Sequence, residues 1–246
     1  MISISSNLNL MIKAAEKASK SIIRDFGEVE KLQVSKKGPN DFVTKTDKLV
    51  EKIIIEELLK SKKNYSFITE ETGMIKNKDK KNIWIIDPID GTTNFLHGIP
   101  HFAISIALKS HDEILSGLIF DPIKDEMFYA EKDKGAFLNN KRLRVSKKSS
   151  LDNCLFGSNH QGLKFSNLNM RCSGCAALDL AYVASGRLDG YFHNNINLWD
   201  VAAGVVIVRE AGGLVNDINK FDINKINIRA SNSSISDKMH EKLTNF

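Results

Sequence analysis

A short segment at 84–95, WIIDPIDGTTNF, holds the residue types that point most directly to chemistry. An apolar run ends at Asp87, and Asp90 follows three residues later, just before Gly91 and Thr92. Carboxylates at a strand end can converge on one point, and an all-oxygen ligand set is the one that Mg²⁺ prefers. The backbone amides of Gly91 and Thr92 could then bind a phosphate. The alternative is a turn whose aspartates only hydrogen-bond the local backbone.

Two other segments add carboxylates to this set. Glu70 and Glu71 follow the strand-like run YSFIT, and Asp200 begins a helix of small residues, VAAGVVIV, that leads to EAGG. Taken singly, the glutamates could lie on the surface, and Asp200 could be a helix N-cap. Taken together with Asp87 and Asp90, they favour a metal site over a local turn.

The elements that must position these carboxylates begin with two helices. Apolar residues recur at helical spacing over 7–26, before a glycine, and again over 47–60, after a polar Thr-Lys-Thr-Asp start. We expect a polar loop at 35–41 between them. Short β-rich runs follow from 65 to 145 and predict a largely antiparallel sheet: YSFIT, IWIID, FAISIAL, EILSGLIF, EMFYAE and AFL.

The C-terminal third alternates between helices and strands. It predicts helices over 176–185 and 201–211, and strands near 190–193, after residue 213 and over 226–229. Such blocks indicate a layered α/β sandwich. Because no linker or repeat separates the parts, we expect a single catalytic domain over 1–246. It would combine an N-terminal α+β part at 1–145 with a C-terminal α/β part at 146–246.

Composition limits the function further. The chain has 35 Lys and Arg against 30 Asp and Glu, a net charge of +5, which suits anionic substrates without requiring nucleic acid. No apolar stretch is long enough to span a bilayer and the N-terminus lacks a signal-peptide pattern, so we expect a cytoplasmic protein that binds no membrane. Three cysteines argue against a disulfide framework. We expect Cys172 and Cys175 to be ordinary semi-buried thiols rather than half of a zinc or redox site.

Four motifs carry a family resemblance: TEE at 69–71, WIIDPIDGTTNF at 84–95, AALDLAYVASGRLDGYF at 176–192 and LWDVAAGVVIVREAGG at 198–213. In the order and residue types of these motifs, the chain resembles the inositol monophosphatase family over nearly its whole length. The resemblance implies an αβαβα sandwich of the inositol monophosphatase and fructose-1,6-bisphosphatase type. It also implies a homodimeric, Mg²⁺-dependent and lithium-sensitive phosphomonoesterase that uses a metal-activated water.

The same resemblance assigns metal ligands. Glu70, Asp87 and the backbone carbonyl of Ile89 would hold a first ion. Asp87, Asp90 and Asp200 would hold a second ion. Glu70 would also contribute to a weaker third ion, so the active site would use two to three Mg²⁺ ions. Paired cations stabilise the attacking and leaving oxygens of an in-line displacement and lower the pKa of a bound water.

Roles in proton transfer and substrate binding are implied in the same way. Thr92 and Asp47 would form a hydrogen-bonded pair that accepts the proton of the attacking water, beside Glu70. Asp47 closes a KxxxxDxVTxTD pattern that starts at Lys36, the position of a loop lysine that is associated with metal and phosphate binding in the family. A solvated loop lysine is the equal alternative. The expected substrate contacts are Lys36, Asp90, Gly91, Thr92, Thr93, Gly174, Cys175, Ala176 and His193.

The chain departs from the family pattern at three places. His193 stands where many members have a glutamate that binds a ring hydroxyl, so it either contacts the substrate or faces solvent. Cys175 replaces a serine or threonine with a more weakly hydrogen-bonding thiol. The segment 147–171 is shorter than in the family and reads as one strand and a loop, which changes the expected dimer contacts and pocket shape.

The leading hypothesis is hydrolysis of a small phosphorylated metabolite, either an inositol-1-phosphate-like polyol or a sugar phosphate. Histidinol phosphate, fructose 1,6-bisphosphate and a 3′-phosphonucleotide are the alternative substrates. A function of a different class is binding to the transcription machinery or to nucleic acid, which the basic charge allows. The complete acidic set argues against a loss of catalysis, although both roles could coexist.

Overall fold

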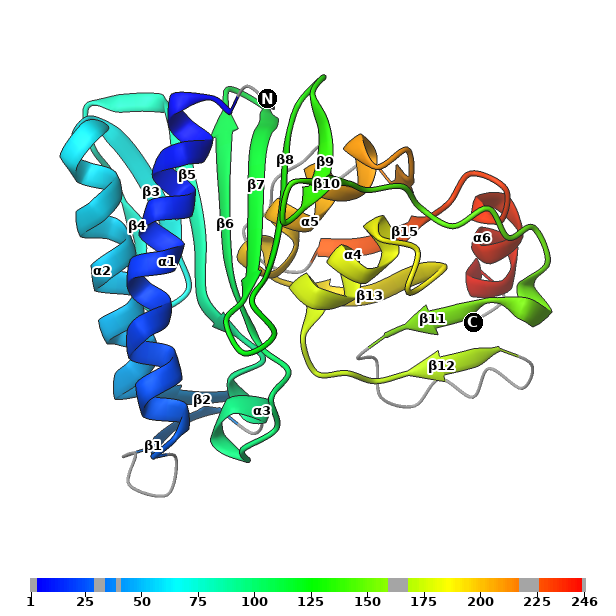
Figure 1. The fold of residues 1–246 in the computed structure, drawn as a ribbon, viewed down its shortest axis with the longest axis horizontal. Coiled ribbons are helices and arrows are strands. Elements are labelled where there is room, and N and C mark those ends of the chain that lie inside the picture. Colours follow the sequence, from blue (N-terminus) through cyan, green and yellow to red (C-terminus); the bar gives the residue numbers. More distant parts are fainter. Residues whose placement is uncertain (1–3, 29–33, 39–40, 159–167, 217–225, 245–246) are drawn as a thin grey trace.

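The computed structural model describes residues 4–28, 34–38, 41–158, 168–216 and 226–244. Helices and sheets alternate within this part of the chain (Figure 1). On one side, α1 (Ser6–Phe26) and α2 (Lys45–Ser61) cover a face of an eight-stranded sheet. The helices α4 (Ala176–Ala184) and α5 (Leu198–Glu210) lie between this sheet and a five-stranded one, and α6 (Ser236–Thr244) covers the far side. The arrangement confirms the predicted αβαβα sandwich.

The two N-terminal helices form where the apolar spacing predicts them. α1 begins after Ser5, whose hydroxyl accepts a hydrogen bond from the Leu8 amide, and it ends at Gly27. One face of each helix is buried against the large sheet, which removes apolar surface from water. The buried apolar residues are Leu8, Leu10, Met11, Ala14, Ala15, Ala18 and Ile22 of α1, with Val50, Ile54 and Leu58 of α2.

The polar loop predicted at 35–41 is wrong. There β1 (Val34–Gly38) and β2 (Asp41–Thr44) pair antiparallel as a small hairpin between the two helices, and residues 39–40 lie outside the described residues. Such a pair is held by backbone hydrogen bonds, so a polar sequence without clear alternation can still form it. Lys36 lies opposite Phe42 in this hairpin.

The large sheet is antiparallel apart from one parallel pair, β3 with β5, as the sequence predicts. Its central strand β5 alternates in facing: Trp84 and Ile86 pack toward α1 and α2, and Ile85 packs toward α4 and α5. Along the sheet the strands are β10 (Lys141–Arg142), β9 (Gly135–Leu138), β8 (Glu126–Glu131), β7 (Glu113–Asp121), β6 (Ala103–Ser110), β5 (Asp79–Asp90), β3 (Tyr65–Thr69) and β4 (Gly73–Ile75).

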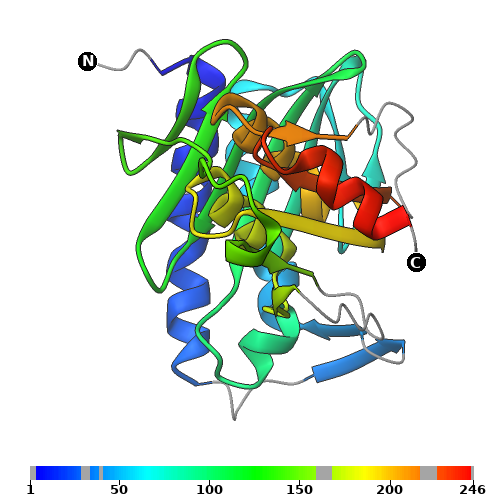
Figure 2. The ribbon, with the colours of Figure 1, turned by 90° about the vertical axis from the view of Figure 1, so that its right-hand side faces the viewer.

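Helix α5 lies between the two sheets, and from Val201 to Val208 it is buried and apolar on all sides, as expected for a helix in the middle layer. Gly117 of β7 lets this helix approach closely, because a Cβ at Gly117 would lie 2.5 Å from the carbonyl oxygen of Ala203. The second sheet, which lies behind the red helix α6 in Figure 2, is made of β12 (Asn169–Arg171), β11 (Leu155–Gly157), β13 (Gly190–Ile196), β15 (Ile226–Ser231) and β14 (Leu214–Val215).

The segment 147–171 contains more structure than the predicted single strand and loop. A short 3-10 turn (Leu151–Asn153) leads into β11, and β12 pairs with β11 in parallel, while 159–167 lie outside the described residues. The sequence analysis missed helix α6, which contributes Met239 to a buried cluster with Phe156 and Phe192 of this sheet; Ile235, just before the helix, belongs to the same cluster. Among the described residues, no helix is long and apolar enough to cross a bilayer.

Candidate metal centre

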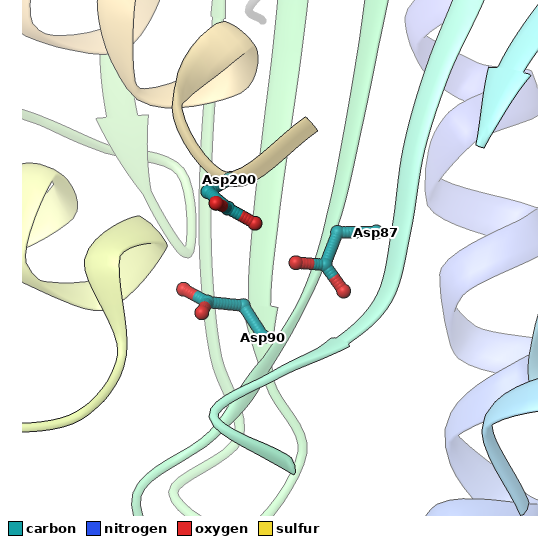
Figure 3. A group of neighbouring side chains, drawn as sticks. All are labelled: Asp87, Asp90 and Asp200. Carbon is teal, nitrogen blue, oxygen red and sulfur yellow. The ribbon is translucent and has the colours of Figure 1, made fainter. Parts of the chain in front are cut away.

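Asp87, Asp90 and Asp200 lie together where the large sheet meets α5 (Figure 3). Asp87 and Asp90 come from the carboxyl end of β5, and Asp200 comes from the first turn of α5. One carboxylate oxygen from each residue lies within 4.8 Å of the other two. Asp87 is buried, and Asp90 and Asp200 are partly exposed. Two distant parts of the chain thus build one acidic cluster.

A β-bulge at the end of β5 turns both aspartates to the same side. Asp87 pairs with Ser105 of β6 and Asp90 pairs with Ala103, so three steps along β5 match two along β6. In a regular strand, residues three apart point to opposite faces, and the extra residue of a bulge corrects this alternation. Within the bulge, the amide of Ile89 donates to Oδ1 of Asp87 at 3.0 Å.

Glu70 and Asp200 are held in place by their own elements. Glu70 follows β3, and the parallel pairing of β3 with β5 brings the carboxyl ends of the two strands to one edge. The Glu70 amide donates to the Ile86 carbonyl at 3.2 Å, and its side chain hydrogen-bonds Asp87. Asp200 is the third residue of α5, and its Oδ2 accepts from the amide of the N-cap residue, Asn197, at 3.1 Å. The pair forms a capping box.

Burial and mutual repulsion disfavour ionisation of the carboxyl groups in this cluster. Removal from water, followed by the charges of Glu70, Asp90 and Asp200, raises the pKa of Asp87 well above its usual range. Removal from water also raises the pKa of Asp90 to about 7 and that of Asp200 to about 8. Carboxyl groups in such proximity cannot all ionise near neutral pH unless positive charge compensates them.

The residues of this cluster fit a hard divalent cation. The side chains that converge offer carboxylate oxygens, which are the donors that Mg²⁺ and similar ions select, and none of the three is a nitrogen or sulfur ligand. A bound cation would compensate the negative charge of the carboxylates and lower their raised pKa values. The site could therefore hold a metal ion.

Asp90 is also tied to the start of α4. Its Oδ2 accepts hydrogen bonds from the thiol of Cys175 at 3.1 Å and from the amide of Ala177 at 2.5 Å. Cys175 is fully buried as the N-cap residue of α4, and Cys172 is exposed, where two semi-buried thiols were expected. Cys154, Cys172 and Cys175 are all free, as the sequence predicts.

Comparison with known proteins shows which family the chain belongs to. The sequence model of the inositol monophosphatase family matches residues 4–245. The chain belongs to the inositol monophosphatase family. A Mesorhizobium japonicum protein named inositol-1-monophosphatase is 46% identical over 227 residues, which cover 86% of this chain and 85% of that protein. A Pasteurella multocida protein named Nus factor SuhB is 43% identical over 227 residues, with the same shares covered.

The fold agrees with this family assignment. The crystal structure of the extragenic suppressor protein suhB from Bartonella henselae matches with a TM-score of 0.92 and 46% sequence identity, over 97% of this chain and 98% of that one. As a member of the inositol monophosphatase family, the chain is a phosphoric monoester hydrolase.

In this family member, the residues predicted to handle protons lie at the starts of two helices. Asp47 is in the first turn of α2 and is 1% exposed. Thr92 opens the short helix α3 (Thr92–Leu96), and its hydroxyl donates to the Ile89 carbonyl at 2.9 Å. Gly91 precedes it with φ +92°, a conformation that favours glycine. The pairing of Thr92 with Asp47 stays a prediction.

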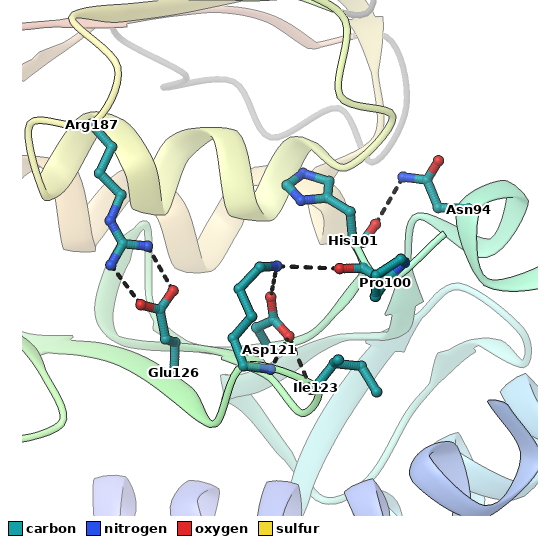
Figure 4. A network of polar contacts seen from close by, with 8 residues as sticks. Asn94, Pro100, His101, Asp121, Ile123, Glu126 and Arg187 are labelled. Carbon is teal, nitrogen blue, oxygen red and sulfur yellow. Dashed lines mark hydrogen bonds and ion pairs between the residues drawn. The ribbon is translucent and has the colours of Figure 1, made fainter. Parts of the chain in front are cut away.

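Asn94 links two segments that carry predicted substrate contacts, and the sequence analysis did not single it out. Its amide nitrogen donates to the carbonyl of His101 at 2.8 Å and to that of Ser173 at 2.9 Å, and Figure 4 shows the first of these bonds. Gly174, with φ +82°, fits over this amide, since a Cβ there would lie 3.0 Å from its nitrogen. Asn94 therefore ties α3 to the loop before α4.

The other predicted substrate contacts lie on separate elements. Gly174 and Cys175 directly precede α4, Ala176 is its first residue, and Thr93 lies within α3. His193 lies on β13 opposite Ile228 of β15 and is half-buried. Lys36 lies on β1. Their contacts with a substrate stay predictions.

Proposed function

We propose that this chain is a Mg²⁺-dependent phosphomonoesterase that acts on an inositol-1-phosphate-like polyol or on a sugar phosphate. The observation that carries the proposal is the cluster of Asp87, Asp90 and Asp200, whose carboxylate oxygens lie within 4.8 Å of one another. The relative named inositol-1-monophosphatase, 46% identical to this chain, supports the substrate class.

The proposed metal ligands are the carboxylates of the cluster, Glu70 and the carbonyl oxygen of Ile89, which would hold two to three Mg²⁺ ions. When bound, paired divalent cations activate a water at neutral pH and neutralise charge on the attacking and leaving oxygens. The protein fixes its carboxylates in advance: Asp90 accepts two hydrogen bonds and Asp200 accepts one from a backbone amide. Carboxylates that are already held in place reduce the reorganisation needed during the reaction.

The proton of the attacking water would pass to Thr92. The Thr92 hydroxyl donates to the Ile89 carbonyl at 2.9 Å. In the proposed role it would turn to donate its proton to Asp47 while its oxygen accepts the proton of the water. Glu70 would share this role, and no covalent nucleophile is required.

The phosphate and the leaving alcohol would lie on opposite sides of Asp90. The backbone amides of Gly91, Thr92 and Thr93 would donate to the phosphate, with Lys36 as a further cation. The alcohol would lie against the loop before α4, which Asn94 and Asp90 hold in place. In this proposal Gly174, Cys175, Ala176 and His193 select the alcohol.

Release of inorganic phosphate from a panel of phosphomonoesters tests the proposal. The panel includes inositol 1-phosphate, a hexose phosphate, histidinol phosphate, fructose 1,6-bisphosphate and a 3′-phosphonucleotide, each assayed with Mg²⁺ and with EDTA. We expect Mg²⁺-dependent release, fastest from the polyol or hexose phosphate. Asp90→Asn should lower the rate by about 100-fold or more. Asp112→Asn, at a side chain that is 98% exposed, should leave it unchanged.

Two results of this assay would count against the proposal. No metal-dependent release from any ester would contradict the enzyme mechanism. Fastest release from one of the other three esters would keep the mechanism and replace the substrate.

A second candidate function is binding to the transcription machinery, because a relative named Nus factor SuhB is 43% identical to this chain. A pull-down at moderate salt tests it, since attachment to nucleic acid by charge alone fades as salt rises. Retention of a defined transcription protein would support this role, and loss of all partners would oppose it.

The proposal extends to a cytoplasmic homodimer that lithium inhibits. A small monovalent ion could occupy the position beside Asp200 in place of Mg²⁺. Asp200→Glu should therefore weaken lithium inhibition, and an unchanged lithium response would contradict this placement. Light scattering during gel filtration measures the oligomeric state directly, and a monomer would contradict the dimer.

A further inference from the structure

Glu51 is a buried carboxylate that the proposed mechanism does not use. It lies on α2, one turn after Asp47, and is 2% exposed. A buried carboxylate is costly unless hydrogen bonds satisfy its oxygens. Both oxygens of Glu51 have such partners: Oε2 accepts from the Glu71 amide at 2.9 Å, and Oε1 accepts from the Thr72 hydroxyl at 2.5 Å.

These two partners form the turn that directly follows Glu70. The strand β3 ends at Thr69, and β4, the short edge strand of the sheet, begins at Gly73. On the side of β5, the Glu70 amide donates to the Ile86 carbonyl at 3.2 Å. On the side of α2, Glu51 holds the next two residues. The backbone of Glu70 is thus fixed from both sides.

Packing alone does not fix this turn. An open pocket of about 350 Å³ borders it, and its lining residues come from α2 and from the turn itself: Lys48, Glu51, Lys52, Ile55, Glu56, Glu71 and Thr72. Thr72 is exposed, and β4 is only three residues long. Where side chains do not fill the space around a turn, directed hydrogen bonds decide its position.

We propose that Glu51 is a positioning residue that keeps the Glu70 carboxylate against Asp87 for metal binding. The proposal rests on the proposed role of Glu70 as a metal ligand. Residues four apart on a helix share a face. Helix α2 would therefore fix the positions of two site residues: Asp47, which it carries, and Glu70, through the contacts of Glu51.

Two matched pairs of variants separate positioning from general stabilisation. Thr72→Val removes the hydroxyl at an exposed position, and Thr72→Ser keeps it. Glu51→Ala removes both contacts. Glu51→Gln can keep both, because its amide oxygen accepts from the Glu71 amide while its amide nitrogen donates to Thr72. Glu56→Ala, at an exposed position on the same helix, is the control.

Calorimetric titration with Mg²⁺ measures the effect without an assay of activity. We expect Glu51→Ala to weaken Mg²⁺ binding about tenfold and Thr72→Val about threefold, while Thr72→Ser, Glu51→Gln and Glu56→Ala weaken it less than twofold. In phosphate release, the half-saturating Mg²⁺ concentration should rise by the same factors, with kcat at saturating Mg²⁺ nearly unchanged. A residue that only stabilises the fold would not produce this split.

Two outcomes would overturn the inference, and they are distinguishable. If the wild-type protein binds Mg²⁺ and Thr72→Val binds it equally well, Glu51 does not position Glu70, and the proposed function stands. If the wild-type protein binds no Mg²⁺, the proposed function fails and this inference fails with it. The Thr72 pair decides the matter even if Glu51→Ala does not fold.

Discussion

The thiol of Cys175 lies 3.1 Å from Oδ2 of Asp90 and donates its hydrogen to that carboxylate. The contact joins the N-cap residue of α4 to Asp90 of the acidic cluster, across 85 positions of sequence. Burial, followed by the charge of Asp90, raises the pKa of this thiol well above its usual range. Cys175 is therefore a hydrogen-bond donor and not a nucleophile in the folded protein.

Thiol reactivity should separate the three cysteines. The thiolate is the reactive form, so exposed Cys172 should react with a disulfide reagent at pH 8 within seconds to minutes, while Cys154 and Cys175 react only as the protein opens. A colorimetric thiol titration measures the rates, and Cys172→Ser is the control. Rapid labelling at Cys175 in folded Cys172→Ser, assigned by peptide mass spectrometry, would contradict the buried Cys175–Asp90 contact.

The stability of the metal-free protein should fall as pH rises. Asp90 and Asp200 have pKa values of about 7 and about 8 in the folded protein, against about 3.9 in an unfolded chain. Because the folded state binds these protons more tightly, their stabilisation is complete below about pH 4 and is lost as pH rises through 7 to 8.

Thermal unfolding in EDTA between pH 5.5 and 8.5 measures this loss. The Tm of the wild type should fall more steeply than that of Asp200→Asn, and Mg²⁺ should restore the wild-type Tm most strongly at the alkaline end. If Tm depended equally on pH for the two proteins in EDTA, Asp200 would not cause the predicted loss of stability.

The sequence predicted the local elements well and the long-range contacts poorly. YSFIT and EMFYAE match β3 and β8 at both ends, because the hydrophobic pattern of a strand depends only on residues that are adjacent in the sequence. The β-bulge that brings Asp90 to the same side as Asp87 could not be predicted in this way, because a bulge is defined by the register of β5 against β6. Helix α6 was missed because it is short and largely polar outside Met239.

The candidate site residues show the same difference between local patterns and long-range contacts. Asp87, Asp90 and Asp200 could be proposed from residue type and motif, and the structure brings them together. Asn94 and Glu51 could not, since their roles depend on partners 79 and 20 residues away along the chain. Asn94 did stand inside a recognised motif, which was the one available signal for it.

Loss of the Asn94 amide should impair both stability and substrate binding. Asn94→Ala leaves the carbonyls of His101 and Ser173 without this donor, which should cost about 1–3 kcal/mol of unfolding free energy. The loop before α4 would then shift, so KM should rise more than kcat falls. Urea unfolding and steady-state kinetics measure the two effects. A less stable protein with an unchanged KM would show that this loop does not line the substrate pocket.

Close contact between β7 and α5 should make Gly117 intolerant of a methyl group. In Gly117→Ala the new Cβ would lie 2.5 Å from the Ala203 carbonyl oxygen and 2.6 Å from Cγ1 of Val206. Overpacking of this kind costs about 1–3 kcal/mol. Gly27→Ala is the control, because its Cβ would lie no closer than 3.4 Å to the nearest atom. Equal denaturant midpoints for both variants would contradict the tight packing of the helix that carries Asp200.

Localisation of the metal tests the central claim most directly. Anomalous diffraction from crystals grown with Mn²⁺, which binds the same oxygen ligands as Mg²⁺, marks the ion positions. We expect anomalous peaks bounded by Asp87, Asp90 and Asp200, at about 2.1 Å from carboxylate oxygens, and no peak beside residue 90 in Asp90→Asn. Absence of a peak among these three carboxylates in the wild-type protein would contradict a metal-dependent mechanism at this site.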